Sequence, residues 1–393
     1  MQKKKKLVRI TTAPMALAYP LSGQPTFMQN NCIDVTMISS GGIELPRLLK
    51  NEGCPHILVP LTRRITPLRD IHALITLVRI FRKIKPDIVH TETPKAGLLG
   101  MIAAYLCGIN IRIHTVAGLP LMVEKGLKLK LLEFIEKVTY SAATNVWPNS
   151  FSLKNFIINH NLVPESKLKV IGKGSSNGIN LKRFTAKNLD ENKLKKIKAQ
   201  IDYNEKNLYM LFVGRLVRDK GIIELVGAFS DLQKSQTHLR LILVGQYERS
   251  LDPLPSEIES EIKTNPAITH ISWTDDVEYY MAFSNYFIFP SYREGFPNVL
   301  LEAGAMGLPI VCSNIAGNID IVTDKETGFL FETQSKSSLK EVMLNAMQQS
   351  SFSLEMSNRL KSRIITNYDR EKFWEMILKE YNILFDQTTT NQQ

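Results

Sequence analysis

The part of this sequence best suited to chemistry is a short stretch with a carboxylate at each end, Glu294 and Glu302. It follows an apolar strand expected at 286–289. A helix is expected to begin at or just after Pro297, since proline is favoured in the first helical turn. The free N–H groups at the start of such a helix lie at the positive end of its dipole and bind anions, most commonly phosphate. Those groups belong to Asn298, Val299 and Leu300.

A second candidate is a basic loop between a strand expected at 208–213 and a helix that begins near Gly221. Arg215 and Lys220 lie on this loop, at the carboxyl end of a strand, where doubly wound sheets bind their ligands. Arginine offers a planar fork of donors to phosphate oxygens, and lysine offers a compact charge. Each motif alone has a plainer interpretation, as a solvated basic turn or as two chance carboxylates. Both motifs in one chain, in this order, favour a phosphate site.

Together the two motifs resemble those of the retaining glycosyltransferases of family 4, whose carboxylates form an E-x7-E pattern. The resemblance implies that Arg215 and Lys220, with the helix N-terminus, bind the diphosphate of a nucleotide-sugar donor. It also implies that Glu294 binds hydroxyls of the donor sugar at the catalytic centre. Glu302 is expected to bind the ribose diol of the nucleotide. The implied sugar contacts extend to Gly295, Phe296 and Pro297, and the implied base contacts are Gly245, Trp273 and Thr274.

The N-terminal half contributes His114, at the end of an apolar strand and within the string H-T-V-A-G-L-P. This string, with H-T-E-T-P-K-A-G at 90–97, resembles a subset of family 4 that builds capsular and other bacterial surface polysaccharides. By this resemblance His114 lies near the donor sugar and assists catalysis. Glu92 and Lys95 are candidates for contact with the acceptor, and Thr93 is the expected N-cap of the following helix. A lone histidine after an apolar strand is more often structural, and that alternative stays open.

One loop departs from the pattern of family 4. Relatives commonly carry a pair of glycines after the first strand, close to the donor phosphate and the acceptor. Here the loop at 12–25 offers only Ser22 and Gly23 as a substitute. These two are therefore acceptor-side candidates, and the departure weakens the case for a phosphate contact there.

Length and composition describe a globular protein of two domains. A chain of 393 residues exceeds the roughly 250–300 residues at which single cores stop growing. Hydrophobic residues make up 44% and charged residues 22% of the chain, as in ordinary soluble proteins. The cysteines are scattered without metal-ligand spacing, so we expect buried thiols in a reducing cytoplasm rather than disulfides or zinc ligands. They are Cys32, Cys54, Cys107 and Cys312.

Charge is unevenly distributed along the chain. Residues 1–185 contain 26 Lys and Arg against 10 Asp and Glu, whereas the remainder contains 23 against 28. Such an asymmetry suggests that the N-terminal half faces an anionic partner. No nucleic-acid module is recognisable, so an anionic membrane or a phosphate-bearing lipid suits the resemblance better, and each Lys or Arg near a bilayer adds about 1 kcal/mol. A solvated surface without a partner stays open as the alternative.

The sequence contains no recognisable signal peptide or membrane span. The lysines at 3–6 and the following Leu7 and Val8 are interrupted by Arg9, so the apolar core of a signal does not form. The most continuous apolar stretch, 98–107, is far shorter than the roughly 20 residues that a span requires. We therefore expect a cytoplasmic protein in peripheral contact with the inner face of the cell membrane.

Strands and helices alternate along the chain, which predicts an α/β fold with parallel sheets. The resemblance adds two Rossmann-like domains of the GT-B type facing a cleft, with the last helix crossing back to the first domain. The acceptor domain is expected at 1–185 with the returning helix at 368–386, the nucleotide-sugar domain at 186–367, and a disordered tail at 387–393. A G-x-G at 172–178 lacks the helix that a dinucleotide fingerprint needs and is interpreted as the linker. The expected strands are 7–11, 33–38, 56–59, 87–90, 111–115, 145–148, 169–171, 208–213, 240–244, 268–271, 286–289 and 309–312, and the clearest helices are 68–84, 128–142 and 370–385.

The predicted activity is transfer of a sugar from a nucleotide sugar, with retention of configuration and without a metal ion. The chain contains no D-x-D motif, which many transferases use to hold a divalent metal, and the resemblance implies no cofactor. It implies a UDP-sugar donor, often N-acetylated in this subset, and a polyprenyl-diphosphate-linked saccharide as acceptor. Three alternatives stay open: a GDP-sugar donor such as GDP-mannose, a UDP-sugar 2-epimerase, and a non-catalytic scaffold or nucleic-acid binder.

Overall fold

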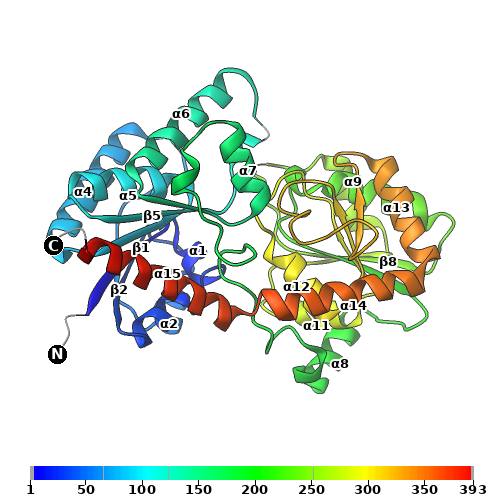
Figure 1. The fold of residues 1–393 in the computed structure, drawn as a ribbon. Coiled ribbons are helices and arrows are strands. Elements are labelled where there is room, and N and C mark those ends of the chain that lie inside the picture. Colours follow the sequence, from blue (N-terminus) through cyan, green and yellow to red (C-terminus); the bar gives the residue numbers. More distant parts are fainter. Residues whose placement is uncertain (1–3, 65, 123, 251, 391–393) are drawn as a thin grey trace. The chain divides into compact units, whose positions relative to one another are not determined.

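The computed structural model describes residues 4–64, 66–122, 124–250 and 252–390 and divides into two compact units (Figure 1). The first unit comprises the chain up to Gly178 together with the residues from Arg370 onward, and the second runs from Ile179 to Asp369. This division falls a few residues before the boundary expected at 185, at the end of the segment interpreted as the linker. The chain thus enters the second unit once and returns from it once.

The first unit is built on a six-stranded sheet with the order β3-β2-β1-β4-β5-β6, and every neighbouring pair is parallel. The chain winds outward from β1 on one side and from β4 on the other, so the topological switch point lies between these two strands. The strands are β1 (Lys5–Ile10), β2 (Ile33–Ser39), β3 (His56–Leu58), β4 (Ile88–Glu92), β5 (Ile111–Val116) and β6 (Asn145–Pro148).

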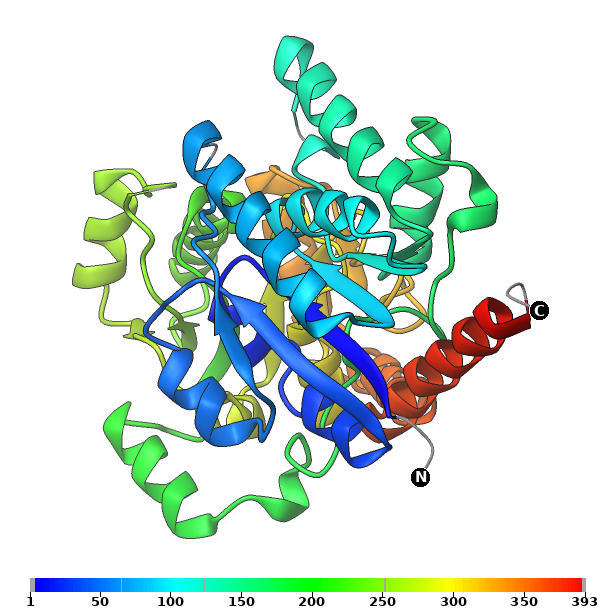
Figure 2. The same ribbon diagram turned by 90° about the vertical axis from the view of Figure 1, so that its left-hand side faces the viewer.

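Helices cover both faces of this sheet, because alternate strand residues point to opposite faces. Val8 and Ile10 belong to the core under α4, α5 and α6, whereas Leu7 belongs to the core that also contains Phe373 and Ile377 of α15. Figure 2 shows the red α15 on the opposite side of the sheet from the cyan α5. The helices are α1 (Pro14–Ala18), α2 (Gln24–Asn30), α3 (Leu45–Asn51), α4 (Pro67–Ile84), α5 (Pro94–Leu106), α6 (Gly126–Ala142), α7 (Phe151–Asn159) and α15 (Arg370–Thr390).

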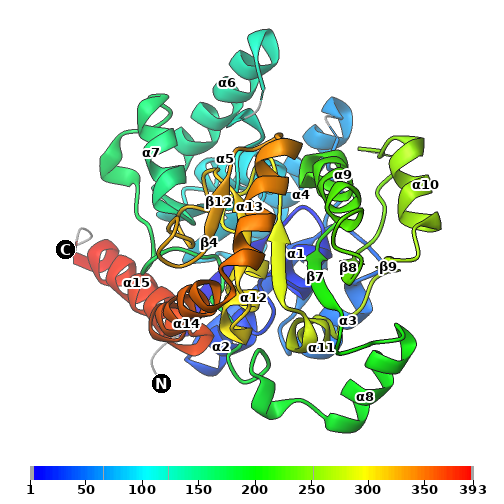
Figure 3. The ribbon, with the colours of Figure 1, turned by 90° about the vertical axis from the view of Figure 1, so that its right-hand side faces the viewer.

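The second unit repeats this plan with a parallel sheet in the order β12-β11-β10-β7-β8-β9, whose switch point lies between β10 and β7. Figure 3 shows α9 beside α13 and α12 beside α14. The strands are β7 (Leu208–Val213), β8 (Leu239–Val244), β9 (Ile268–Ile271), β10 (Tyr286–Phe289), β11 (Ile310–Ser313) and β12 (Phe329–Phe331). The helices are α8 (Glu191–Gln200), α9 (Ile222–Gln233), α10 (Ser256–Thr264), α11 (Val277–Phe283), α12 (Asn298–Met306), α13 (Lys336–Gln348) and α14 (Ser350–Asn367).

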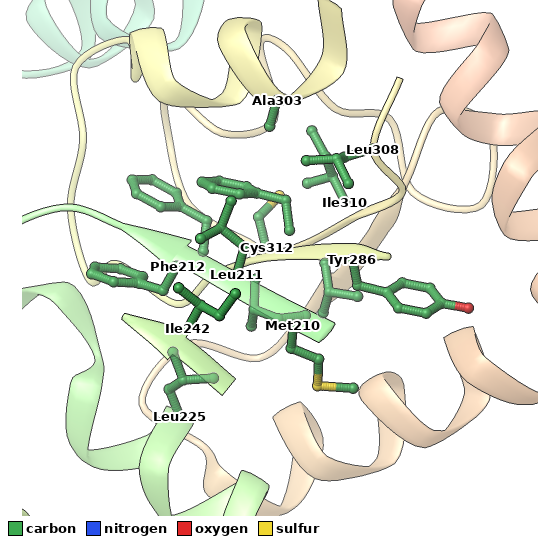
Figure 4. Packing of buried hydrophobic residues seen from close by; sticks show 14 of the residues in the cluster. Met210, Leu211, Phe212, Leu225, Ile242, Tyr286, Ala303, Leu308, Ile310 and Cys312 are labelled. Carbon is green, nitrogen blue, oxygen red and sulfur yellow. The ribbon is translucent and has the colours of Figure 1, made fainter. Parts of the chain in front are cut away.

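The central strands of the second sheet are buried on both faces, which explains their continuous apolar sequence. Figure 4 shows Ala303 of α12 on one side of β7 and Leu225 of α9 on the other. Met210, Leu211 and Phe212 of β7 are at most 1% exposed. A rigid, fully packed strand therefore leads directly into the basic loop at 214–221.

Two predicted elements differ in the structure, and one observed strand was not predicted. The strand expected at 169–171 is absent, because the chain there makes only an isolated bridge between Val146 and Leu168 before turning away. The short strand β12 was not predicted, and its three residues pair only with β11. The tail expected to be disordered from 387 continues α15 to Thr390, and the Thr388 hydroxyl donates to the Phe385 carbonyl at 2.8 Å. Residues 391–393 lie outside the described residues.

The cysteines are all free thiols, but only two of them are buried as predicted. Cys54 and Cys312 are buried, Cys107 is half-buried and Cys32 is exposed. Burial raises the pKa of Cys54 to about 12. The prediction of four buried thiols is therefore wrong for Cys32, which lies in the turn between α2 and β2.

The apolar stretch at 98–107 forms most of α5, a helix of 13 residues that packs between α4 and α6. Gly97 and Gly100 lie against the sheet, where a Cβ would meet His114 and Thr91 respectively. Ala96, Met101 and Ala103 are fully buried. Among the described residues, no helix combines the length and apolar character needed to cross a bilayer.

Candidate active site

The two motif loops leave the second sheet side by side at its switch point. Strand β10 pairs directly with β7, with Tyr286 opposite Met210 and Phe287 opposite Leu211. The loops that follow these strands therefore emerge from neighbouring carboxyl ends, where doubly wound sheets bind ligands. The two motifs lie some 80 residues apart in the sequence, but in the fold they form one surface.

Polar contacts hold the two loops together. The Tyr292 N–H donates to the Asp219 carbonyl at 2.8 Å, and the Arg293 guanidinium lies 2.7 Å from the Asp219 carboxylate. Beside them, Lys220 forms an ion pair with Glu294, and their side chains are only 17% and 14% exposed. The structure thus brings together the lysine and the first glutamate that the sequence singled out. Asp219, which sequence reasoning passed over, ties one loop to the other.

Gly221 makes this close approach possible. It has a φ of +68° and forms the N-cap of α9, and a Cβ at this position would collide with the Pro290 carbonyl oxygen. A left-handed backbone in contact with another backbone is a position that only glycine fills without strain. A single missing side chain therefore sets the distance between the basic loop and the E-x7-E loop.

The helix N-terminus lies where the sequence predicted it, with one difference. Pro297 is the extended N-cap, and α12 begins at Asn298. The Leu300 N–H donates to the Pro297 carbonyl at 3.1 Å, so it is not free as expected. The N–H groups of Asn298 and Val299 have no intrahelical acceptor. The buried Oδ1 of Asn298 likewise has no partner among the described residues.

Arg215 lies on the same loop but is more exposed. Its side chain is 51% exposed and forms an ion pair with Glu248. The loops after β7 and β8 also touch, because a Cβ on Gly245 would collide with the Gly214 carbonyl oxygen. The buried Gly245 carbonyl bonds to the Nε2 of His270 at 2.9 Å. The ends of three neighbouring strands, β10, β7 and β8, therefore carry the residues of the predicted diphosphate site.

Among the remaining donor-side candidates, Glu302 lies near Arg183. The Arg183 guanidinium donates to Glu278 at 2.7 Å. Burial lowers the pKa of Arg183, but the hydrogen bond to Glu278 and the charges of Glu278 and Glu302 raise it overall. Glu302 is thus part of a local charge network. Trp273 is 53% exposed, and the Thr274 hydroxyl accepts from the Asp276 N–H at 3.1 Å. Gly295, Phe296 and Pro297 are buried.

In the first unit, two threonines meet at the switch point between β1 and β4. The hydroxyls of Thr12 and Thr93 lie 2.7 Å apart, and the Thr12 N–H donates to Thr93 at 3.0 Å. Thr93 occupies the N-cap position of α5 but makes no side-chain capping bond, contrary to the expectation. Its hydroxyl is held by Thr12 instead, while the Thr12 hydroxyl accepts from the Ala96 N–H at 3.3 Å.

His114 is a buried neutral side chain of this unit. It is 2% exposed, and its Nδ1 lies 2.9 Å from the Thr91 hydroxyl. Desolvation by burial lowers the pKa of His114 to about 4, so the ring is uncharged at neutral pH. The ring occupies the space that a side chain on Gly97 would need. In this structure the histidine offers hydrogen bonds rather than charge.

The acceptor-side candidates are engaged within the unit. Glu92 is 4% exposed and lies 3.3 Å from the Arg9 guanidinium. Lys95 is held 2.8 Å from the Asp70 carboxylate. The Gly23 N–H donates to Glu52, and a Cβ on Gly23 would lie 2.6 Å from the Trp374 ring. The Ser22 carbonyl accepts from the Asn177 amide at 3.2 Å. Gly23 therefore has a packing role against α15.

A buried polar cluster under α15 was not predicted. His90 bonds through Nδ1 to the Tyr381 hydroxyl at 2.6 Å and through Nε2 to the Thr115 hydroxyl at 2.7 Å. Burial, with the charges of Arg9 and His114, lowers the pKa of His90 well below its ordinary value. Arg9, His90 and Glu92 occupy strand positions that face the core. These polar residues at core positions were the sequence signal that could have indicated the cluster.

No group of three or more His, Cys, Asp or Glu side chains within the described ranges is arranged to hold a metal ion.

Two family models match the chain, one to each half. The model of glycosyl transferases group 1 matches residues 193–365, and the model described as glycosyl transferase 4-like matches residues 23–150. The capsular polysaccharide biosynthesis glycosyltransferase CapM from Staphylococcus aureus is 34% identical over 382 residues, which cover 97% of both chains. The chain belongs to the glycosyltransferases that these two models describe, group 1 in its second half and 4-like in its first half. The predicted family is therefore confirmed.

Other similar proteins agree with this assignment. The glycosyltransferase is 26% identical over 345 residues, 87% of each chain, to the UDP-Gal:alpha-D-GlcNAc-diphosphoundecaprenol alpha-1,3-galactosyltransferase of Escherichia coli. Among solved structures, HepE from Anabaena, crystallised with UDP and glucose, superposes with a TM-score of 0.80 at 16% identity and covers 96% of this chain and 99% of its own. The predicted fold class, an α/β protein with two parallel sheets of the GT-B type, is confirmed.

Proposed function

We propose that this glycosyltransferase moves a sugar from a UDP-sugar to a polyprenyl-diphosphate-linked saccharide, with retention of configuration, in the biosynthesis of a bacterial surface polysaccharide. The observation that carries the proposal is the Lys220–Glu294 pair beside the N-terminus of α12, at the switch point of the second sheet. The names of the Staphylococcus aureus and Escherichia coli relatives support the pathway, the donor and the acceptor class.

The second unit supplies what a leaving diphosphate requires. Lys220, Arg215 and the N–H groups of Asn298 and Val299 are fixed donors and charges that stabilise negative charge as it develops. Both cations are paired with carboxylates of the chain, Lys220 with Glu294 and Arg215 with Glu248. Donor binding exchanges these partners for phosphate oxygens. Glu294 is then free to accept hydrogen bonds from hydroxyls of the sugar.

The nucleotide and sugar contacts complete this unit's role. Glu302, held in the charge network of Arg183, binds the ribose diol. The backbone at Gly245, with Trp273 and Thr274, contacts the base. The Asn298 Oδ1 lacks a partner among the described residues, and in this proposal it accepts a hydrogen bond from a hydroxyl of the donor sugar. Gly295, Phe296 and Pro297 shape the sugar pocket.

Retention follows from departure and attack on the same face of the sugar. The bond between the anomeric carbon and the diphosphate oxygen breaks through an oxocarbenium-like state, and the acceptor hydroxyl oxygen forms the new bond. The hydroxyl proton passes to an oxygen of the departing diphosphate. No metal ion is needed in this scheme, because Lys220, Arg215 and the helix N-terminus carry the charge stabilisation.

The first unit receives the acceptor in this proposal. Its carboxyl-end loops contribute Lys95 near the Thr12–Thr93 contact, and its net positive sequence suits a diphosphate-bearing lipid. His114 assists by a hydrogen bond from a neutral ring, as its lowered pKa requires. The acceptor's lipid places the enzyme at the inner face of the cell membrane.

Binding of UDP tests the donor assignment. A ligand present at a hundred times its dissociation constant stabilises the folded state by about 2.7 kcal/mol, so we expect UDP without added metal to raise the melting temperature. GDP and NAD at the same concentration are expected to have no effect, and a Glu302→Gln variant should show a smaller response to UDP. A shift with GDP alone would instead indicate a mannose-type donor. No shift in melting temperature with either UDP or GDP would contradict the proposed donor site.

A further inference from the structure

Helix α6 of the first unit carries an exposed apolar stripe. Leu127 is 86% exposed, Leu131 is 51% exposed and Phe134 is 64% exposed. These residues are spaced four and then three positions apart, so they share one face of the helix. Figure 1 shows α6 at the edge of the helical layer of the first unit. Large apolar side chains gathered on one helix face mark an interaction surface more often than isolated ones do.

The opposite face of α6 already anchors the helix to the unit. Thr139 and Tyr140 are fully buried, and α6 packs against α5. Leu129 and Leu132 pack against the same core cluster. The helix is therefore held in place without its outer stripe, which is left for a partner outside the unit.

Lysines border the stripe, and the acidic residues of the helix are engaged elsewhere. Lys128, Lys130 and Lys137 are exposed, and they lie on both sides of the apolar positions at 100° per residue. Lys128 is paired with Glu124, just before the helix, at 2.6 Å. Glu136 is 5% exposed, so it faces the core. Glu133 bonds to the Nδ1 of His160 at 2.9 Å. The outer face of α6 thus combines an apolar centre with a positive border.

The neighbouring helix α4 adds a surface of the same chemistry. It packs on the other side of α5 and exposes Leu68, Ile71 and Ile75. Its exposed residues at 79, 82 and 83 are basic. Asp70, its only acidic residue, is paired with Lys95. Negative charge is therefore scarce along this helical layer.

We propose that the outer face of α6 docks on an anionic lipid bilayer, with Leu127, Leu131 and Phe134 in the interface and the bordering lysines on the headgroups. An amphipathic helix with an apolar stripe and basic flanks lies in the plane of such an interface. Positive side chains near an anionic leaflet strengthen binding, each by a factor of about five. The inference rests on the proposed function for the reason why the enzyme visits a membrane, since its acceptor is lipid-linked.

Vesicle sedimentation tests this surface with the full-length protein. We expect wild type to bind vesicles containing about a third phosphatidylglycerol, and to bind pure phosphatidylcholine at least about tenfold more weakly. Leu127→Ser/Leu131→Ser/Phe134→Ser and, separately, Lys128→Glu/Lys130→Glu/Lys137→Glu should each weaken binding to the anionic vesicles at least about tenfold. Raised salt should weaken wild-type binding further.

A matched control changes exposed apolar residues of the second unit. Leu354 and Ile365 of α14 are 55% and 45% exposed, and Leu354→Ser/Ile365→Ser should bind vesicles as wild type does. Wild type that ignores anionic vesicles, or α6 variants that bind them as wild type does, would overturn the proposal. Thermal response to UDP is expected to be unchanged in the α6 variants. If wild type showed no rise in melting temperature with UDP, the proposed function would be contradicted, whereas the docking surface would not be affected.

Discussion

Lys220→Ala is expected to lower kcat/KM for sugar transfer by at least about a hundredfold, because it removes a fixed charge from the departing diphosphate. The effect should appear in kcat as well as in donor affinity, since the negative charge on the leaving group grows in the transition state. Steady-state kinetics with a UDP-sugar and a short-chain lipid-linked acceptor would measure both. Turnover close to that of wild type would remove Lys220 from the site.

The same substitution also leaves Glu294 without its cation, so controls must separate chemistry from folding. Glu294→Gln keeps the side-chain shape and is expected to lower kcat by a similar factor while the protein remains folded. Lys336→Ala breaks another lysine pair of this unit, with Asp231 at 2.9 Å, and should leave turnover unchanged. Thermal melts of all three variants establish that the fold persists.

Gly221→Ala is expected to destabilise the second unit by about 3 kcal/mol, combining a left-handed backbone with a clash in a packed region. The new Cβ would meet the Pro290 carbonyl oxygen, so the basic loop and the E-x7-E loop are forced apart. We therefore expect weaker UDP binding even at temperatures where the variant is folded. Urea unfolding and calorimetric titration with UDP measure the two effects.

Gly307→Ala is the matched control for this experiment. Gly307 also has a left-handed backbone, with a φ of +83°, but a Cβ there would come no closer than 3.6 Å to Lys361. The substitution should lower the free energy of unfolding by about 1 kcal/mol, through backbone strain alone, and leave UDP affinity unchanged. Equal losses of stability in the two variants would show that contact between the loops is unimportant.

Local patterns were sufficient to predict that the two motif loops follow neighbouring strands of the second sheet. Strand β7 ends at Val213 and β10 at Phe289, as their apolar runs indicated. Pairing of these strands in a parallel sheet then brings Lys220 and Glu294 together. The sequence pattern did not predict which acidic residues pair with the arginines of these loops. Asp219 and Glu248 form such pairs because loops distant in sequence lie side by side in the fold.

The first unit shows the limit of such reasoning more clearly. Contact of Glu92 and Gly23 with the acceptor stays a prediction, but the pairing of Glu92 with Arg9 and the packing of Gly23 on Trp374 were not predicted. Both contacts join residues far apart in sequence. Helix α15 buries His90 and bonds to it through Tyr381. No local sequence pattern predicts which strand residues a returning helix will cover.

The anomeric configuration of the product, from a transfer reaction run with a chelator present, decides whether the enzyme retains configuration without a metal ion. The purified enzyme would be given α-linked UDP-sugars, N-acetylated ones included, and a polyprenyl-diphosphate-linked saccharide, and the new linkage would be assigned by NMR. We expect an α-linked product formed without divalent metal. A β-linked product, a strict requirement for metal, or release of an isomerised sugar without an acceptor would contradict it.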